Sequence, residues 1–114
     1  MRRVIIESPY AGDVETHTIY ARRCVRDSLQ RGESPIASHL LYTQPGILDD
    51  NVLKEREHGI VAGYSWMEVA DAVIFYNDYG VSEGMANALG ERYNFLPYNP
   101  KLEIEVRSIG VNPT

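Results

Sequence analysis

Residues 70–90, ADAVIFYNDYGVSEGMANALG, place an apolar run, a glycine-containing turn and the start of a helix one after another. The run at residues 72–76 does not alternate between apolar and polar residues, which is typical of a parallel strand covered on both faces. Ser82 stands where a serine commonly caps a helix, and the apolar spacing after it predicts a helix to about Tyr93. This segment therefore predicts one strand-to-helix unit of a parallel α/β sheet.

A second unit of the same kind opens the chain. Residues 4–6 form a short β-branched run that ends in the turn SPYAGD, and Asp13 can cap the helix that follows. Gly32 marks the end of this helix, because glycine readily adopts the left-handed conformation of a helix C-terminus. The expected buried face of the helix consists of Val14, Ala21, Cys24, Val25 and Leu29.

The middle of the chain predicts a third unit. Residues 35–38 have the composition of a short strand, and the loop QPGILDDN leads to a helix that we expect to reach about Ala70. Asp49 and Asp50 would stabilise the start of that helix through its dipole. Gly59 and Gly63 lie four apart, on one helix face, and predict a close approach by a backbone, a neighbouring helix or a ligand. The apolar positions expected along the helix are Leu53, Ile60, Met67 and Val69.

The C-terminal part predicts two further strands. The stretch NFLPY, residues 94–98, has the pattern of a short edge strand broken by Pro97. Residues 102–109, LEIEVRSI, alternate, which indicates a strand with one solvated face, at a sheet edge or against another subunit. Taken in order, the units predict a flavodoxin-like or Rossmann-like three-layer α/β fold with a mostly parallel sheet, in a single domain of residues 1–114.

Composition limits the classes of function. The chain has 114 residues, enough for one hydrophobic core, and a formal net charge of −5, which argues against nucleic-acid binding and favours a small polar ligand. Cys24 is the only cysteine, so a disulfide framework and a zinc site are excluded and a reducing cytoplasm is expected. The longest apolar run is too short to span a membrane. We expect no membrane association, no metal and no organic cofactor.

The predicted fold indicates where a ligand would bind. Ligands of open parallel sheets bind outside the carboxyl ends of the strands, where helix N-termini point. The turns ESPYAGD and YNDYGVSEG occupy such places, and their glycines would leave room for a ligand. The candidate site residues are Ser8, Tyr10, Gly12, Asn77, Asp78, Gly80, Ser82, Glu83 and Gly84.

Glu83 has the most specific chemistry among these candidates. An acid in the first turn of a helix is kept ionised by the helix dipole and by free backbone N–H groups. An ionised, oriented carboxylate is what a nucleophile at an acetal-type carbon requires. The alternative is structural, because acids are common in first helical turns; Tyr10 has the same kind of alternative, as a packing residue.

The histidines carry less information. His17, His39 and His58 have no metal-ligand spacing to one another, so each is expected to be a structural or exposed residue. Ser38 and His39 are adjacent, and adjacent side chains on a strand point apart, so we do not expect them to form a nucleophile–base pair.

The two turns, together with HLLYTQPGILDDN and WMEVADAVIFYND, resemble the nucleoside 2-deoxyribosyltransferase-like superfamily, particularly small bacterial and phage domains with a similar SEGM turn. The similarity covers residues 3–98. It implies that Glu83 attacks the anomeric carbon of a deoxyribosyl unit and that Tyr10 helps to hold this nucleophile. It also implies that Asn77, Asp78 and Ser82 bind sugar or phosphate.

The chain departs from this superfamily in two places. Members that cleave nucleotides have an arginine- and glycine-rich first turn for the 5′-phosphate, whereas SPYAGD has no arginine. They also have an aspartate a few residues before the position of Trp66, near the place where this chain has Gly63. Asp49, Asp50 and Glu57 are alternative candidates for the general acid, and the sequence does not choose between them.

Three functions are consistent with these features. The first is an enzyme that cleaves or exchanges the N-glycosidic bond of a nucleoside or nucleotide. The second is a protein of the same fold that only sequesters its ligand, for instance a phage protein that captures a signalling nucleotide in the host cytoplasm. The third is an oligomeric accessory protein. We expect a homodimer or higher homo-oligomer, because superfamily members complete their pockets across subunits.

Overall fold

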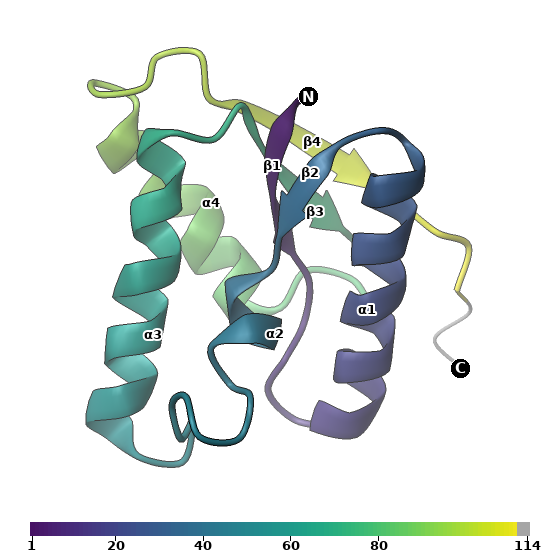
Figure 1. Ribbon diagram of the computed structural model, residues 1–114, viewed down its shortest axis with the longest axis vertical. Helices are drawn as coiled ribbons and strands as arrows, with labels where there is room; N and C mark the ends of the chain where they lie inside the picture. Colours follow the sequence, from purple (N-terminus) through teal and green to yellow (C-terminus); the bar gives the residue numbers. More distant parts are fainter. Residues whose placement is uncertain (112–114) are drawn as a thin grey trace.

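The structure is a computed structural model that describes residues 1–111, in which helices cover both faces of a sheet (Figure 1). Four parallel strands follow the order β2-β1-β3-β4. The strands are β1 (Arg3–Glu7), β2 (Ser34–Ile36), β3 (Ala72–Tyr76) and β4 (Glu103–Arg107). The helices are α1 (Val14–Gln30), α2 (Ser38–Leu41), α3 (Leu53–Ser65), the 3₁₀ turn η1 (Trp66–Glu68) and α4 (Glu83–Phe95). The predicted three-layer α/β fold is therefore confirmed, with α1 on one side of the sheet and α3 and α4 on the other.

The two central strands are β1 and β3, as their apolar sequences predict. They pair in parallel, with Ile5 opposite Val73 and Ile6 opposite Ile74. Ile6, Val73 and Ile74 are completely buried. Because successive residues of a strand point to opposite faces, strands between two helical layers need apolar residues at every position.

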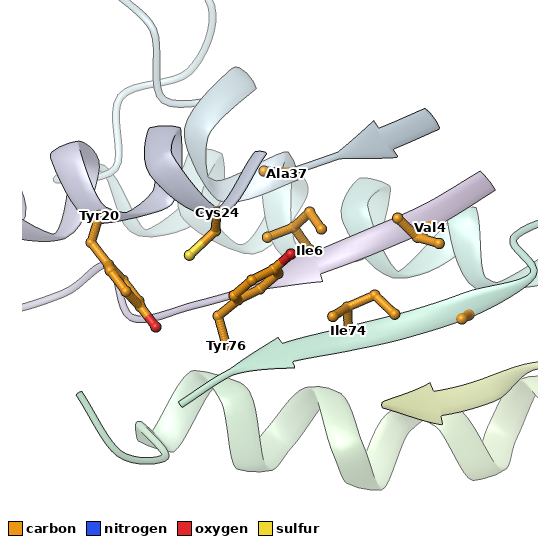
Figure 2. Close-up of a cluster of buried hydrophobic side chains, with 8 residues drawn as sticks. Val4, Ile6, Tyr20, Cys24, Ala37, Ile74 and Tyr76 are labelled. Carbon is orange, nitrogen blue, oxygen red and sulfur yellow. The ribbon is translucent and has the colours of Figure 1, made fainter. Parts of the chain in front are cut away.

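One hydrophobic cluster lies on each face of the sheet. Figure 2 shows the first, in which Tyr20 and Cys24 of α1 point toward Ile6 of β1 and Tyr76 of β3. Its members are Val4, Ile6, Tyr20, Cys24, Ala37, Ala72, Ile74 and Tyr76. The second cluster joins the sheet to η1 and α4 through Ile5, Met67, Ala70, Val73, Phe75, Met85, Ala88 and Leu102.

The starts of α1 and α4 are where the sequence predicts them. The Thr16 N–H donates to Asp13 Oδ1 at 3.2 Å, and the Met85 N–H donates to Ser82 Oγ at 3.2 Å. These bonds satisfy N–H groups that have no partner inside the helix. Gly32 follows α1 with a φ of +83°, which confirms its role as a C-terminal glycine.

Two predictions for the chain after residue 50 are wrong, one for a helix and one for a strand. The helix expected to reach Ala70 ends at Ser65, and the chain tightens into η1, where the N–H groups of Val69 and Ala70 both donate to the Trp66 carbonyl. The predicted edge strand at residues 94–98 is absent from the described chain, because α4 continues to Phe95 and Phe95 packs against the second cluster. Phe95 and Leu96 extend the face of α4 that packs on the sheet, whereas Tyr98 is exposed.

The predicted strand at residues 35–38 is shifted, because α2 begins at Ser38. The reason lies in α3, whose glycines allow the close approach that their spacing predicts. A Cβ atom on Gly63 would lie 2.9 Å from the Ser38 Cβ, and one on Gly59 would lie 3.1 Å from the Leu48 Cδ1. The predicted close approach by a neighbouring helix is confirmed at Gly63, where α2 lies, whereas at Gly59 the neighbour is the side chain of Leu48 in the preceding loop.

Several side chains expected in the core are exposed instead. Ala21, Cys24 and Met67 are buried as predicted. However, α3 packs through its glycine face and through Tyr64, so its other apolar positions face outward. The exposed residues are Leu53 and Ile60 of α3, Val69 after η1, and Val14 and Leu29 of α1.

Strand β4 lies at a sheet edge, as its alternation predicts, but the face expected to be solvated carries an ion-pair network. Ile104 packs against the second cluster, and Val106 is exposed. Arg107 donates from both terminal nitrogens to the two carboxylate oxygens of Glu33, at 2.6 and 2.7 Å. Arg107 also donates to Glu105 at 2.9 Å. Polar alternation here reflects charge pairing on the α1 side of the sheet.

Candidate functional site

The strand order reverses between β1 and β3, since β2 was added on one side of β1 and β3 on the other. In open parallel sheets, such a reversal leaves a crevice outside the carboxyl ends of the two strands. Residues that follow β1 and β3 flank it, together with the start of α4. The topology thus brings the two predicted turns to one edge of the sheet, which we treat as the candidate site.

Ser8 follows β1 and is almost completely buried. A hydrogen bond of 2.8 Å joins its Oγ to His39 Nε2. Burial lowers the pKa of His39 to about 4, so the imidazole is neutral at pH 7. The sequence directs attention to Ser38 as a neighbour of His39, but the serine that meets the imidazole comes from 31 residues away.

Tyr10 packs against the same histidine. The two rings meet edge to face, with their centroids 6.4 Å apart. The Tyr10 carbonyl accepts a hydrogen bond from His17 Nδ1 at 3.1 Å, which ties the turn to α1. Gly12, at the end of this turn, has a φ of +91°, a conformation that other residues rarely adopt. The roles of Tyr10 and Gly12 toward a ligand remain predictions.

Asp78 follows β3 and anchors the segment after β4. Its carboxylate accepts hydrogen bonds from the Tyr20 hydroxyl at 2.6 Å and the Ser108 hydroxyl at 2.6 Å. It also accepts from three successive backbone N–H groups, those of Ile109, Gly110 and Val111, at 3.0, 2.9 and 3.0 Å. Burial disfavours the charge, but these hydrogen bonds outweigh it and lower the pKa of Asp78. A ligand hydroxyl would have to displace one of these donors.

Asn77 and Ser82, the remaining polar residues of this turn, take part in hydrogen bonds that shape the backbone. Asn77 is exposed, and its carbonyl accepts the Gly80 N–H at 2.8 Å, which closes the turn. Gly80 has a φ of +78°. Ser82 caps α4 as described above. A Cβ on Gly84 would come no closer than 3.9 Å to the Ser82 Oγ, so packing does not require glycine there.

Glu83 is the first residue of α4 and is exposed. The buried face of the helix contains Met85 and Ala88. At 3.6 residues per turn, Glu83 lies roughly 200° around the helix from Met85. Its side chain therefore starts at the carboxyl edge of the sheet but on the outer side of α4.

Glu7 is a residue that the sequence analysis passed over. It is the last residue of β1, and burial raises the pKa of its carboxyl to about 8. Burial raises the pKa of Tyr64, and the charges of Glu7 and Glu91 raise it further, so Tyr64 lies near each of these two acids. One signal could have identified Glu7: it is an acid at the carboxyl end of an otherwise apolar central strand.

Two hollows in the surface lie elsewhere. The larger, of about 250 Å³, is bounded by the amino-terminal parts of β1 and β2 and by Trp66 and Val69. The smaller, of about 90 Å³, lies between α1 and the residues Tyr79 and Val111. Neither hollow touches Tyr10 or Glu83. We place the candidate site at the carboxyl edge of the sheet because strand-end loops and helix N-termini converge there. The size of a hollow is a weaker criterion, because neither hollow combines these features.

Within residues 1–111, histidine, cysteine and acidic side chains form no group that could hold a metal ion. In the same part of the chain, no helix is long and apolar enough to cross a membrane.

Comparison with known proteins gives a fold and a family. A 2-deoxyribosyltransferase from the bacterium Bacillus psychrosaccharolyticus has a similar fold, with a TM-score of 0.54 at 16% sequence identity. The similarity covers 96% of this chain and 75% of the transferase chain. A comparison with curated proteins finds no match. Residues 2–94 match the family described as "Domain of unknown function (DUF7768)". Because the match spans most of the sequence, the chain belongs to the DUF7768 family.

Proposed function

We propose that the chain binds a nucleoside or nucleotide in the crevice between β1 and β3 and cleaves or exchanges its N-glycosidic bond. The main support is the start of α4 at the carboxyl edge of β3, in a fold similar to that of a 2-deoxyribosyltransferase. A helix N-terminus favours bound or developing negative charge through its dipole and its free N–H groups. It is therefore a suitable place for an attacking carboxylate and for phosphate.

In this proposal Glu83 is the nucleophile. Its carboxylate forms a bond to C1′ of the sugar while the bond from C1′ to the base nitrogen breaks, and the electron pair leaves with the base. The base takes up a proton. Water or a second base then attacks C1′, loses a proton and releases the Glu83 carboxylate. Glu83 is exposed in the free protein, so its side chain has to turn toward the crevice when a ligand binds.

The polar residues of the two turns complete the proposed site. Tyr10 orients the nucleophile. Ser8 holds His39 in place through its hydrogen bond, and Tyr10 packs on the same histidine. Asn77 and Ser82 offer polar groups to the sugar or a phosphate, and Asp78 fixes the turn that carries them. Gly12 and Gly80 hold the turns in conformations that leave the strand ends open.

The alternative is a protein that binds a nucleotide without cleaving it. The outward position of Glu83 favours this alternative, because no change of side-chain direction is then needed. The hydrogen bonds to the Asp78 carboxylate favour it too, since they occupy the acceptor positions that a catalytic role would need.

We also propose that the protein acts as a homodimer or higher homo-oligomer in the cytoplasm. Support comes from the edge strand β4, where Val106 is exposed, and from the exposed apolar residues of α3, including Leu53 and Ile60. Light scattering at micromolar concentration tests this part. The mass of a monomer would contradict a pocket shared between subunits.

The function is tested by incubating the protein with nucleosides, nucleoside monophosphates and cyclic ADP-ribose-type nucleotides. Chromatography then measures both the released base and the ligand that stays bound. Released base supports cleavage, and a base exchanged into a new nucleoside supports transfer. Tight retention without release supports sequestration. If no member of the panel is bound or changed, the nucleoside proposal is wrong.

A further inference from the structure

Glu7 occupies an unusual place for a carboxyl group. It is the last residue of the central strand β1 and pairs in register with Phe75 of β3. Because side chains alternate along a strand, Glu7 points to the same face as Ile5, the face covered by α3 and α4. Tyr64 of α3 lies near it, and Met85 and Ala88 of α4 pack on the same face of the sheet. Glu7 therefore stands where the β1–β3 crevice meets the α4 side of the sheet.

The carboxyl of Glu7 has no compensating partner within residues 1–111. Burial is the cause of its raised pKa, with no hydrogen bond or cation to oppose it. At the same time, no side-chain nitrogen or oxygen in the described chain is both fully enclosed and unpartnered. The Glu7 oxygens are consequently deep but still within reach of a small molecule. A fold that needed only stability would have an apolar residue here, as at Ile5 and Phe75.

We propose that Glu7 contacts the base of the bound nucleoside and donates the proton that the departing base requires. This inference rests on the proposed function and supplies the general acid that the sequence analysis left unidentified. Two of the candidates considered there, Asp49 and Glu57, fit less well. Asp49 and Glu57 are exposed, and Asp49 already accepts the Asn51 N–H at 2.9 Å.

The proposed step conserves atoms and charge. As the bond between C1′ and the base nitrogen breaks, the electron pair moves onto the base, and the base takes the proton from the Glu7 carboxyl. Glu7 is left as a carboxylate. It then accepts a proton from the water or the incoming base that attacks C1′, which restores both Glu7 and the nucleophile.

The surroundings of Glu7 keep the proton in place before the reaction. With a pKa of about 8, the carboxyl is protonated at pH 7. Tyr64 from α3 is the titratable neighbour whose pKa responds to the charge of Glu7. The Tyr64 phenol is neutral at this pH, so burial of the carboxyl alone holds the proton on Glu7.

The test compares the wild-type protein with Glu7→Gln and with a control, Glu91→Gln. The four natural 2′-deoxynucleosides and their 5′-monophosphates serve as probes. Affinity is measured by calorimetry between pH 6 and pH 9.5, and released base by chromatography. Glutamine keeps a hydrogen-bond donor but has no proton to transfer. We expect Glu7→Gln to retain binding, to lose the fall in affinity above pH 8, and to lose turnover by about 10²–10⁴-fold. Glu91→Gln should retain turnover.

Each outcome separates the inference from the proposed function. If wild-type protein binds without turnover, and its affinity depends on Glu7 protonation, Glu7 recognises the base and the enzymatic part of the function is wrong. If turnover occurs and Glu7→Gln leaves both its rate and the pH dependence of binding unchanged, the role of Glu7 is wrong and the function stands. If no probe binds to wild-type protein, both are wrong.

Discussion

Two acids, the buried Glu33 and the half-buried Glu7, have opposite surroundings. Glu33 precedes β2 and is held by Arg107 through two hydrogen bonds, by Arg2 at 3.0 Å and by the Ser28 hydroxyl at 2.8 Å. Arg107, above all, lowers the pKa of Glu33 to about 2. Glu7 has no such partners, and burial raises its pKa to about 8. The same side chain is thus held charged in one region and neutral in the other.

The difference in surroundings indicates different roles for the two acids. The Glu33 region satisfies each charge and joins β4, α1 and the start of β2, so its role is to hold the edge of the sheet. The Glu7 region leaves a polar group unpaired at the edge where ligands bind in folds of this type. Buried polar groups that lack partners cost stability, and such costs are common where function requires them.

The largest effect is expected from Arg107→Met. This change leaves Glu33 buried with too little positive charge around it, and breaking a buried pair on one side costs about 3–5 kcal/mol. Urea unfolding at pH 7 measures the loss. Arg31→Met is the control, because Arg31 forms a more exposed pair with Asp27 at 2.9 Å and should cost less than about 1 kcal/mol. Equal losses in the two variants would show that the Glu33 ion pairs stabilise the fold no more than an exposed pair does.

The next effect concerns the pH dependence of stability through Glu7. Its pKa is raised on folding, so the stability that it contributes is fully present below pH 4.5 and is lost as the pH rises through about 8. Glu7→Gln removes the penalty for ionisation. We expect the variant to be more stable than wild type by about 2–4 kcal/mol at pH 9 and nearly equal to it at pH 4.

Unfolding in urea at both pH values measures this difference. Glu33 should behave in the opposite way, because its lowered pKa gives stability above pH 4.5 that is lost as the pH falls toward 2. A Glu7→Gln protein that is less stable than wild type at pH 9 would show that the carboxyl has a stabilising partner in solution.

The sequence predicts the fold better than it predicts these surroundings. The apolar runs at residues 4–6 and 72–76 and the caps at Asp13 and Ser82 are local signals, and the structure agrees with each. Even the close approach at Gly63 is visible as a spacing. The four-residue helix α2 has no such signal in the sequence. A helix this short is not stable alone, so its contact with α3 decides its position.

The candidate site is harder to predict because its main features are tertiary. The raised pKa of Glu7 comes from desolvation by helices that are distant in sequence, and the anchoring of Asp78 involves residues 30 or more positions away. Glu7 has only the weak local signal of an acid at the end of an apolar strand, and the anchoring of Asp78 has no signal at its own position. The roles of Glu83 and Tyr10 stay predictions, since they depend on a ligand.

A smaller effect is expected where α3 approaches Glu7. Gly63 precedes Tyr64, and an alanine there would press against Ser38 of α2, so that α3 must shift. Overpacking of this kind costs about 1–3 kcal/mol. Gly90→Ala is the matched control, since a Cβ there meets no atom within 4 Å and should raise stability by up to about 1 kcal/mol. Thermal unfolding measures both, and a neutral Gly63→Ala would show that α2 yields easily.

The smallest stability effect is expected from Glu83→Gln, and here the effect on function decides. Glu83 is an exposed acid in the first turn of α4, so loss of its charge should cost about 0.3–1 kcal/mol through the helix dipole. Glu15→Gln is the control, because Glu15 also lies in the first turn of its helix, as the second residue of α1, and should have a cost in the same range. If Glu83 only stabilises its helix, the two variants turn over or bind ligand alike. If Glu83 is the nucleophile, its variant alone loses turnover while it still binds the nucleoside. Loss of binding in Glu83→Gln alone would instead favour a sequestering protein that holds a sugar hydroxyl with this carboxylate. Thermal unfolding, calorimetric titration and chromatography of the same two variants distinguish the three results, and unchanged turnover in a folded Glu83→Gln protein would remove the nucleophile from the mechanism.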